Sequence, residues 1–434
     1  MDLSQVKYKL SRYNVIHRVG EIEYMWNTFS DSLIKLDKAS QEYITSFSGI
    51  DDNSKEFGIL KKNGFIVFEQ LDEFGRICLY EKQELFSRET DASYTIALGM
   101  GCNYCCEYCY EASANRSEVM TPEIASQVAE YICSQHSSTS HIQNISITWF
   151  GGEPLLYTDV LELISQKVIE YTTQNNIKYS ARIITNGRFL DELTLITLQK
   201  YCVKSAQITI DGKRELYIKS KGASPEDFDS VISNVLSASG KIRLNIRLNI
   251  QNNDLCEAIA ITDYLLSECD LIGKISLDFA FINDYSLSVN DARQAYIDYV
   301  DNYSRWVDYI VRQYGANKVG ITVPRRKITF CGAVKVGNVC IGANGQLFRC
   351  FDNFGDNSMV VGDIWQGRFF NDTESLYYSR SYYAPENECT KCEWLPVCMG
   401  GCISQRIGGY GGFDCERYKH LQFKLKLLEG GVRI

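Results

Sequence analysis

The chain has 434 residues and a formal net charge of −9, with 45% hydrophobic and 23% charged residues. This composition is typical of a folded globular protein of two or three domains, and the negative charge argues against nucleic-acid binding through phosphate neutralisation. No run of 18 apolar residues predicts a membrane span, and the N-terminus lacks the regions of a signal peptide, so we expect a cytoplasmic protein without a membrane partner.

Residues 1–90 predict a small α+β domain of the winged-helix type. Short alternating segments read as strands and a helical pattern follows them: Tyr13–Arg18, Glu21–Trp26, Ser32–Leu36 and then Ala39–Phe47. Gly20 marks the turn between the first two strands, and Asp37 is the expected N-cap of the helix. We expect this domain to bind a partner, because it contains no cluster of catalytic residue types.

Residues 91–320 alternate between strand and helix patterns. The expected strands are Tyr94–Leu98, Ile145–Trp149, Ala181–Thr185, Ala206–Ile210, Ile242–Asn249 and Ile275–Phe281. Helical patterns between them include Pro122–Cys133, Val160–Gln174 and Pro225–Ala238. Six such units predict a parallel sheet, either open or closed into a partial (β/α)6 TIM-like barrel, with the chemistry at the carboxyl ends of the strands.

Residues 321–434 are rich in cysteine, glycine and tyrosine, and carry one long helical pattern at about Cys415–Leu428. A segment with so little core patterning needs another source of stability. Bound metal is the natural one, so we expect a metal-binding domain here.

Seventeen cysteines stand out in a chain that we expect in the cytoplasm, where disulfides are rare. Five isolated cysteines read as small buried hydrophobic residues: Cys78, Cys133, Cys202, Cys256 and Cys269. The other twelve form two groups, which indicates metal ligation.

The first group has the spacing C-x3-C-x2-C and follows the first strand of the barrel-like region, at Cys102, Cys106 and Cys109. Three thiolates can hold three irons of a [4Fe–4S] cluster and leave the fourth iron open to a small molecule, whereas a structural site closes every position. Cys105 is out of register and reads as a neighbour of the ligands. A zinc loop is the alternative interpretation.

This spacing, with the aromatic Tyr108 before the last cysteine, resembles the signature of radical S-adenosylmethionine (SAM) enzymes. The resemblance implies that the open iron chelates SAM and that Tyr108 contacts the adenine. Gly151, Gly152 and Glu153 follow the second strand and resemble the GGE element that binds the SAM amino group. Glycines allow a close backbone approach, and a carboxylate can pair with an ammonium.

Three further strand ends carry residues that resemble SAM or substrate contacts of this family. Asn186 ends the third strand and Asp211 the fourth, and an ordinary loop turn is the alternative for each. Arg247 lies with Asn249 on the fifth strand and is similar to an arginine that meets the SAM carboxylate, although Arg243 is a nearby alternative.

The second group of cysteines resembles the SPASM extension with one extra member, Cys340. By this resemblance a first auxiliary cluster takes Cys331, Cys340, Cys350 and Cys402, and a second takes Cys389, Cys392, Cys398 and Cys415. Eight thiolates suffice for two [4Fe–4S] clusters, and a zinc ribbon is the alternative. Without Cys340 as a ligand, the first cluster would be open to a substrate thiolate. Asp352 lies one position from where some relatives carry a catalytic base, and a solvated loop residue is the favoured interpretation.

Together these resemblances imply a radical SAM enzyme with three [4Fe–4S] clusters, bound SAM and a reductant such as flavodoxin or ferredoxin. Residues 24–37 are similar to the leading domain of maturases for ribosomally made (RiPP) peptides, which capture the leader of a precursor peptide by strand addition. We therefore expect a peptide maturase that forms a thioether or carbon–carbon crosslink. An anaerobic sulfatase-maturating enzyme, a peptide epimerase and a noncatalytic electron carrier are the alternatives.

Overall fold

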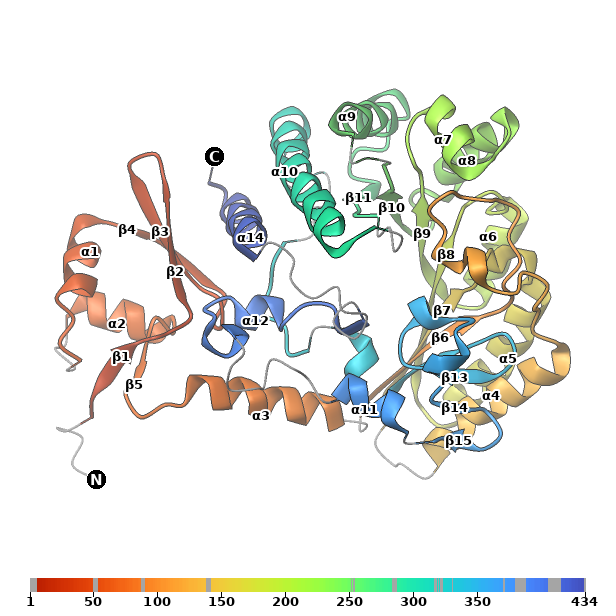
Figure 1. Cartoon of the computed structure of the whole chain (residues 1–434), viewed down its shortest axis with the longest axis horizontal. Coiled ribbons are helices and arrows are strands. Elements are labelled where there is room, and N and C mark those ends of the chain that lie inside the picture. The colour runs from red at the N-terminus through yellow and green to blue at the C-terminus, as the bar shows by residue number, and fades with distance from the viewer. Residues whose placement is uncertain are drawn as a thin grey trace.

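The computed structural model describes residues 6–49, 54–86, 90–137, 142–250, 252, 254–282, 287–315, 318, 320, 323–329, 331–369, 371–378, 388–404 and 415–432. Figure 1 shows an N-terminal unit at the left and a large sheet with its helices at the right. The C-terminal segment returns to both of them.

The N-terminal unit has two small sheets and three helices. Its elements are β1 (Tyr8–Leu10), β2 (Asn14–Val19), β3 (Ile22–Asn27), β4 (Ser32–Leu36), α1 (Lys38–Thr45), α2 (Lys55–Lys62), β5 (Ile66–Phe68) and α3 (Glu73–Phe86). Strands β2, β3 and β4 form an antiparallel sheet in that order, and β1 pairs with β5. The three expected strands are confirmed, and so are the left-handed turn at Gly20 and the N-cap, where the Asp37 carboxylate accepts from the Ser40 N–H. That the unit is a winged-helix domain stays a prediction.

The central sheet has ten strands in the order β11-β10-β9-β8-β7-β6-β12-β13-β14-β15. They are β6 (Asp91–Ala97), β7 (Asn144–Phe150), β8 (Lys178–Thr185), β9 (Val203–Thr209), β10 (Arg243–Leu248), β11 (Ile275–Phe279), β12 (Asn338–Ile341), β13 (Gln346–Phe348), β14 (Gly362–Asp363) and β15 (Gly367–Arg368). Strands β6 to β11 are parallel and lie in chain order, so the six expected strands are confirmed and the sheet is open.

Strands from the cysteine-rich segment extend this sheet at the β6 edge, which the sequence does not predict. β12 pairs with β6 in parallel, and β13, β14 and β15 follow antiparallel to one another. The sheet therefore crosses residue 320, where we expect one domain to end. The boundaries at residues 90 and 320 remain predictions.

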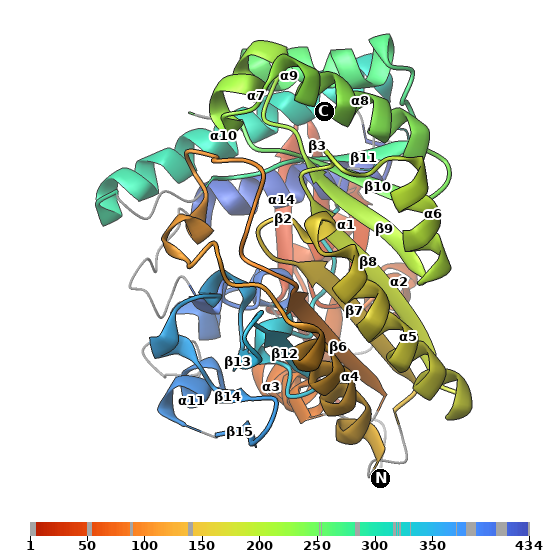
Figure 2. The same cartoon turned by 90° about the vertical axis from the view of Figure 1, so that its right-hand side faces the viewer.

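Helices cover one face of the sheet, as Figure 2 shows for α4, α5 and α6. The remaining helices are α4 (Pro122–Ser137), α5 (Thr158–Gln174), α6 (Glu192–Lys200), α7 (Arg214–Lys221), α8 (Pro225–Ala238), α9 (Leu255–Asp263), α10 (Val289–Tyr314), α11 (Asp372–Tyr378), α12 (Leu395–Cys398) and α14 (Cys415–Glu429). The expected helices at α4, α5, α8 and α14 are confirmed, whereas the 26-residue α10 is not among the predicted elements.

The two faces of the sheet differ in polarity because side chains alternate along each strand. Ile145 and Ile147 of β7 are buried in the core beneath the helices. Thr148 lies between such residues and therefore faces the other way. We call this second side, which the helices do not cover, the inner face.

An aromatic cluster joins the N-terminal sheet to the C-terminal segment. Trp26 of β3 is fully buried and makes edge contacts with Trp394 and with Phe423 of α14, at ring-centroid distances of 5.4 and 6.0 Å. Removing the N-terminal unit would expose these rings to water, so the unit is part of the core of the whole chain.

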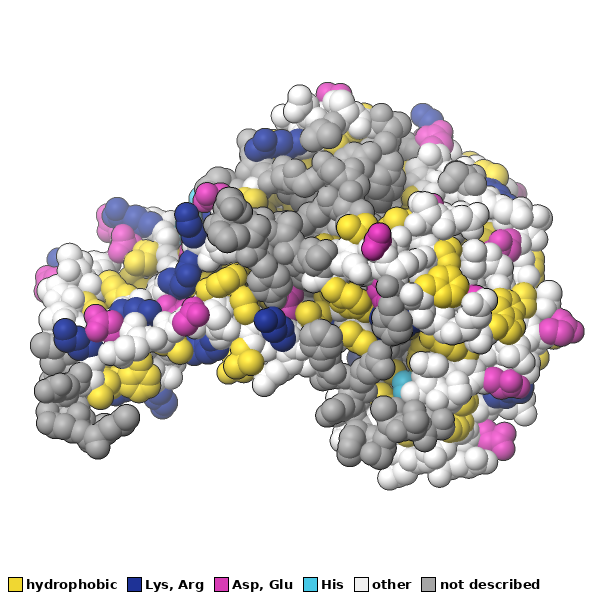
Figure 3. Space-filling view, turned by 60° about the horizontal axis from the view of Figure 1, so that its bottom comes forward, with side chains coloured by type: hydrophobic (Ala, Val, Ile, Leu, Met, Phe, Trp, Pro, Cys, Tyr) yellow, Lys and Arg dark blue, Asp and Glu magenta, His cyan; other side chains and the backbone are white. Residues whose placement is uncertain are grey.

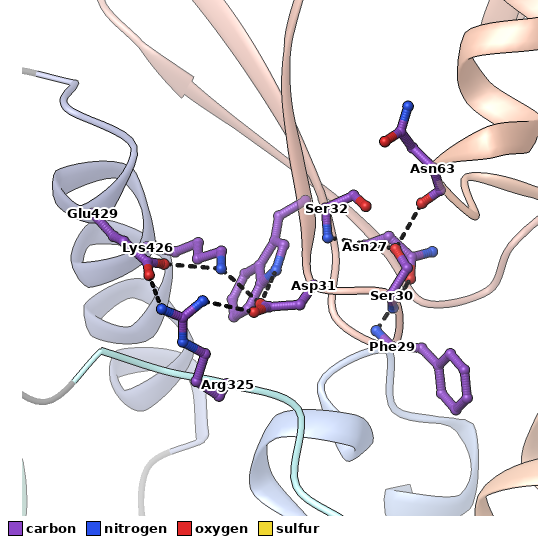
Figure 4. Close-up of polar contacts among 10 residues, drawn as sticks. Asn27, Phe29, Ser30, Asp31, Ser32, Asn63, Arg325, Lys426 and Glu429 are labelled. Carbon is purple, nitrogen blue, oxygen red and sulfur yellow. Dashed lines mark hydrogen bonds and ion pairs between the residues drawn. The ribbon is translucent and has the colours of Figure 1, made fainter.

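An ion-pair network, drawn in Figure 4, lies beside this cluster, because Asp31 also accepts a hydrogen bond from Trp26. Asp31, in the turn before β4, accepts hydrogen bonds from Lys426 Nζ at 2.7 Å, Arg325 Nη1 at 3.1 Å and Trp26 Nε1 at 3.3 Å. Glu429 binds the same two cations. Only 6% of the Lys426 side chain is exposed, so these charges are less screened than a surface pair.

Replacing Asp31 by asparagine should lower the free energy of unfolding by about 1 kcal/mol, because the nearly buried Lys426 loses a charged acceptor. Asparagine tolerates the left-handed backbone of this turn, where φ is 63°, so the change reports on charge alone. Urea unfolding followed by tryptophan fluorescence measures the loss. Glu21→Gln, on the exposed β2–β3 turn, is the matched control, and equal stability of the two variants would contradict the expectation.

Among the helices that the structure describes, none combines the length and the apolar composition needed to cross a membrane.

Figure 3 shows basic and acidic side chains interspersed over the N-terminal unit rather than gathered into a patch of one sign.

Candidate functional site

The cysteine loop, residues 98–121, connects β6 to α4 and holds the three cysteines of the first group. Burial raises the pKa of Cys102 to about 11, and the thiols of Cys106 and Cys109 act in the same direction. The three thiols are therefore close enough to interact. Buried thiolates that repel one another need a cation to hold them ionised, as iron in a cluster would. Cys105 is exposed and accepts a hydrogen bond from Arg116 Nη1 at 3.3 Å.

The two glycines after β7 let the chain pass against the backbone of the cysteine loop. The N–H of Gly152 donates to the carbonyl of Gly99 at 3.0 Å, and the N–H of Glu153 donates to that of Gly101 at 2.9 Å. A Cβ on Gly151 would collide with the Gly99 carbonyl oxygen, and a Cβ on Gly152 with that of Gly101. The glycines thus position the loop itself, in addition to any ligand that they contact.

Replacing Gly152 by alanine should cost about 1–3 kcal/mol of stability and lower the iron bound after reconstitution. The new Cβ would lie 2.6 Å from the Met100 carbonyl oxygen, a backbone atom that yields only if the loop shifts. Chemical unfolding and iron assay give the two readouts. Gly58→Ala, in α2 with open space around it, is the control and should not reduce either value. Normal stability and iron content in both variants would refute this role.

Glu153 is fully buried, and its carboxylate is occupied by protein donors. One oxygen accepts from the Leu155 N–H at 2.9 Å and the Thr185 hydroxyl at 2.6 Å, and the other accepts from the Asn186 N–H at 2.7 Å. Burial raises the pKa of this carboxyl. In this structure Glu153 therefore ties the end of β7 to the end of β8. A direct bond from its carboxylate to an ammonium stays a prediction.

Asn186 stands next to the cysteine loop. Its side-chain nitrogen donates to Asn103 Oδ1 at 2.8 Å and lies 3.9 Å from Cys102 Sγ. The strand end predicted from the Thr-Asn-Gly sequence is thus in contact with the loop.

A buried ion pair, which the sequence does not predict, lies behind the cysteine loop. Lys221 Nζ is 3.2 Å from Asp211 Oδ1, with 2% and 0% of the two side chains exposed. Tyr108 and Ser220 each donate a hydroxyl to Asp211 Oδ2 at 2.7 Å. Burial lowers the pKa of Lys221, but the charge of Asp211 and the thiol of Cys106 together have the larger effect. The pKa of Lys221 is therefore raised.

Lys221 ends α7, and the carbonyls of this helix end hold the cysteine loop. Its carbonyl accepts from the Cys105 N–H at 3.0 Å, and that of Ser220 accepts from the Glu107 N–H at 3.2 Å. The one local signal is the left-handed Gly222 that caps the helix. Nothing in the sequence indicates that the preceding lysine turns toward the cysteines.

The remaining expected contacts gather at the end of β10. Arg247 Nε donates to Asn249 Oδ1 at 3.0 Å, and Nη1 lies 4.0 Å from Asp278 of β11. Burial raises the pKa of Asp352, and Arg247 opposes this rise. Asp352 is thus half-buried and within electrostatic reach of the strand ends, and neither interpretation of this residue is decided. Its role as a base stays a prediction. Arg243 lies exposed at the start of β10.

Glu111, two residues after Cys109, is a second carboxyl near the site, and no motif in the sequence singles it out. Burial raises its pKa to about 7, and Asp352 acts in the same direction. The part of the cysteine-rich segment around Asp352 therefore lies close to the cysteine loop.

Several of the C-terminal cysteines influence one another's pKa values, and their assignment to two clusters stays a prediction. Burial raises the pKa of Cys350, and Cys340 and Cys331 act in the same direction. Burial raises the pKa of Tyr377, and the thiols of Cys350, Cys340 and Cys402 act in the same direction. In the second group, burial raises the pKa of Cys398, and the thiols of Cys415 and Cys389 act in the same direction. Burial also raises the pKa of Cys392, and Cys398 acts in the same direction. Cys340 is buried and lies on β12, opposite Thr95 of β6.

The spacing of these thiols bears on the zinc alternative. In the described part of the chain, no three His, Cys, Asp or Glu side chains are grouped tightly enough to hold one metal ion. Zinc bonds of about 2.3 Å in a tetrahedron bring thiolates to about 3.8 Å from one another. A [4Fe–4S] cluster lies between its ligands and needs them further apart than a zinc ion does. The zinc ribbon stays the alternative interpretation of these cysteines. The five isolated cysteines are not fully buried as expected: Cys256 is exposed and Cys78, Cys133, Cys202 and Cys269 are half-buried.

Comparison with known proteins gives one family match. The model of the radical SAM superfamily matches residues 96–250, from β6 to the end of β10. The radical SAM cyclopropyl synthase TigE of Paramaledivibacter caminithermalis is 25% identical, over 93% of this chain and 88% of that protein. A cysteine-type anaerobic sulfatase-maturating enzyme of Clostridium perfringens is 22% identical, over 70% of this chain and 86% of that protein.

The fold is shared with a solved structure of the sulfatase-maturating type. The native anSMEcpe with bound AdoMet superposes with a TM-score of 0.56 at 18% identity, over 78% of this chain and 98% of that one. The match of residues 96–250, the open parallel sheet and the three interacting thiols at the end of its first strand agree with one another. The chain is therefore a radical SAM enzyme, and such enzymes use a [4Fe–4S] cluster and SAM.

Proposed function

We propose that this enzyme modifies a ribosomally made precursor peptide by abstracting a hydrogen atom and forming a carbon–carbon or thioether crosslink. The observation that carries the proposal is that the cysteine loop, the C-terminal cysteines and the three-stranded N-terminal sheet, whose edges are β2 and β4, belong to one folded unit. The proposed domains are 1–90 for peptide recognition, 91–320 for radical chemistry and 321–434 for the auxiliary cysteines.

The proposed SAM site lies at the carboxyl ends of β6 to β10. Cys102, Cys106 and Cys109 would hold a [4Fe–4S] cluster that supplies the electron for cleaving SAM to a 5′-deoxyadenosyl radical. Lys221 is a buried cation that interacts with the thiols of Cys106 and Cys102, and it can pair with the SAM carboxylate, a role that the sequence resemblance gives to Arg247. Tyr108 remains the proposed adenine contact.

The remaining expected contacts have supporting parts in this proposal. The backbone at Gly151 and Gly152 lines the approach to the cysteine loop, and Glu153 holds that backbone to Asn186. Asp211 keeps Lys221 charged, and Asn249 orients Arg247. This arrangement is preorganised, because the hydrogen bonds exist before a ligand arrives.

A crosslink requires the substrate to lose two hydrogens. One leaves as an atom to 5′-deoxyadenosyl, and the other leaves as a proton while one electron passes to an acceptor. The C-terminal cysteine groups would hold that acceptor as two [4Fe–4S] clusters, which makes three per chain with Cys340 as a ligand. Asp352 is the proposed proton acceptor, since burial keeps its pKa above that of a surface aspartate.

The relatives bear on the type of bond. A cyclopropyl ring is closed by a carbon–carbon bond, and the TigE alignment covers 93% of this chain, against 70% for the sulfatase-maturating enzyme. This favours carbon–carbon bond formation over a thioether, and peptide modification over sulfatase maturation. Formylglycine formation is the second candidate, because the central fold is shared with the sulfatase-maturating type.

The first experiment is anaerobic reconstitution followed by iron analysis. About twelve irons per chain are expected, and about four would remove the auxiliary clusters. Peptides encoded by neighbouring reading frames are then incubated with the enzyme, SAM and dithionite. A mass loss of two hydrogens with an intact backbone supports a crosslink. A product that reacts with aldehyde probes would instead establish formylglycine formation.

Leader binding is tested by hydrogen exchange, because deleting the N-terminal unit would uncover Trp394 and Phe423. β2 and β4 are the two edges of the N-terminal sheet. Strand addition should slow amide exchange along one of these edges when the precursor peptide is added. Unchanged exchange at both edges, with the peptide bound, would contradict capture by this unit.

A further inference from the structure

A row of polar side chains crosses the inner face of the central sheet below the cysteine loop. Thr95 of β6, Thr148 of β7 and Arg182 of β8 lie opposite one another in the strand register. Their neighbours Ala181 and Ile183 are buried beneath the helices. Because side chains alternate along a strand, Arg182 points to the uncovered side.

The backbone at Arg182 is irregular. The register between β8 and β9 shifts between Ala181 and Arg182, so that Ala181 pairs with Val203 while Arg182 pairs with Ser205. The extra residue on β9 makes a β-bulge, a feature that re-aims side chains and is frequent beside active sites. The Thr148 hydroxyl accepts a hydrogen bond from Arg182 Nε at 2.8 Å, which fixes the stem of the side chain.

Arg182 has no counter-charge in the residues that the structure describes. No carboxylate oxygen there lies within 4.0 Å of its guanidinium, whereas Arg247 has Asp278 at that distance. Burial lowers the pKa of Arg182, and no neighbouring charge offsets this. The side chain is nevertheless open to solvent. A desolvated yet reachable arginine whose terminal nitrogens have no partner among the described residues is suited to an incoming anion.

We propose that the guanidinium of Arg182 binds a carboxylate of the substrate peptide and so selects which segment of the peptide reaches the cysteine loop. This inference rests on the proposed function, because it requires a peptide along the inner face. The planar fork of arginine matches a carboxylate through two parallel hydrogen bonds. The carboxylate can belong to an acidic side chain or to the carboxyl terminus of the peptide.

The depth of Arg182 separates this site from the SAM site. Arg182 precedes the end of β8 at Thr185 by three residues, which places it roughly 10 Å below the strand end. Lys221 lies at the helix end that holds the cysteine loop, and Arg247 lies near the end of β10, so both belong to the proposed SAM site.

An apolar layer lies between Arg182 and the strand ends. Ala97, Phe150 and Ile184 occupy the next inner-face positions, and they pack in one cluster with Phe348 and Phe354 of the C-terminal segment. A peptide bound at Arg182 would pass beside this layer to reach the cysteine loop with its reacting carbon. The reacting carbon and the carboxylate would then be separated by about two or three residues of extended chain.

The test uses equimolar synthetic libraries of seven-residue peptides, one with free carboxyl termini and one amidated. Peptides retained by the reconstituted enzyme are sequenced by mass spectrometry. We expect about tenfold enrichment of Asp and Glu in the amidated library if a side chain binds, or preferential retention of the free-acid library if the terminus binds. Arg182→Gln should abolish the selection and Arg182→Lys should keep part of it. Arg305→Gln, on the exposed face of α10, should keep all of it.

Phenylglyoxal labelling of the wild-type enzyme gives a readout that needs neither a variant nor turnover. Retained peptides should slow the modification of Arg182, whereas SAM alone should not. Protection by SAM alone would assign Arg182 to the cofactor and overturn the proposal, as would equal carboxylate selection by Arg182→Gln or none by the wild type. A peptide that protects Arg182 yet is never crosslinked would leave this inference standing and count against the proposed function.

Discussion

Replacing Cys106 by alanine is expected to abolish formation of 5′-deoxyadenosine from SAM and dithionite. Cys106 lies between the other two cysteines of the first group, and the three thiols interact in the folded chain. Two thiolates cannot hold three irons of a cubane, so the variant should lose about four irons per chain. Without that cluster no electron reaches SAM, and product should fall below detection by mass spectrometry.

The chain provides a matched control one residue away. Cys105→Ala removes a thiol from the same loop, but this thiol is exposed and its hydrogen-bond partner is Arg116. We expect the Cys105 variant to keep its iron and its SAM cleavage within about twofold, since surface substitutions away from such features change little. Equal loss in both variants would mean that the loop, rather than the ligand set, was disturbed. Full activity of the Cys106 variant would refute the assignment.

Replacing Lys221 by methionine is expected to destabilise the enzyme by about 3–5 kcal/mol, because the change leaves Asp211 charged and fully buried. Methionine has a similar length, so loss of volume contributes little. The hydroxyls of Tyr108 and Ser220 still reach Asp211 but supply no charge. Thermal and urea unfolding measure the effect.

The double variant Asp211→Asn/Lys221→Met separates charge from packing. It removes both members of the pair and should recover most of the lost stability, because no uncompensated charge remains. Its affinity for SAM, measured by equilibrium dialysis, should stay low if Lys221 meets the SAM carboxylate. A double variant as unstable as Lys221→Met would contradict the ion-pair explanation, and normal SAM affinity would contradict the binding role.

Much of the fold can be predicted from the sequence because its signals are local. The strands β6 to β11 are short apolar runs between helical patterns. The cysteine loop is recognised from the spacing of its cysteines within eight residues. Asp37 is recognisable as an N-cap because it precedes a helical pattern directly.

The features that escape prediction depend on distant partners. β12 has four residues, and only its pairing with β6 makes it part of the central sheet. In the sequence, Lys221 is an ordinary lysine at a helix end. Only the tertiary packing of α7 against the cysteine loop reveals its role. Glu153 follows two glycines that suggest a ligand site, but its carboxylate is satisfied by β8, which no spacing reveals.

The pairing of β12 with β6 also governs when the protein can become complete during synthesis. Asn338 lies beside Ser93, so the edge of β6 stays without its partner until most of the chain has left the ribosome. Contacts this distant in sequence form slowly, and an uncovered strand edge invites pairing with other chains. The proposed loading of iron onto the C-terminal cysteines and the pairing of this edge therefore depend on the same late segment. Expression under iron limitation should yield aggregates in which the uncovered edge of β6 pairs with other chains. The cysteine loop, which follows β6 directly, is synthesised long before β12 can cover this edge.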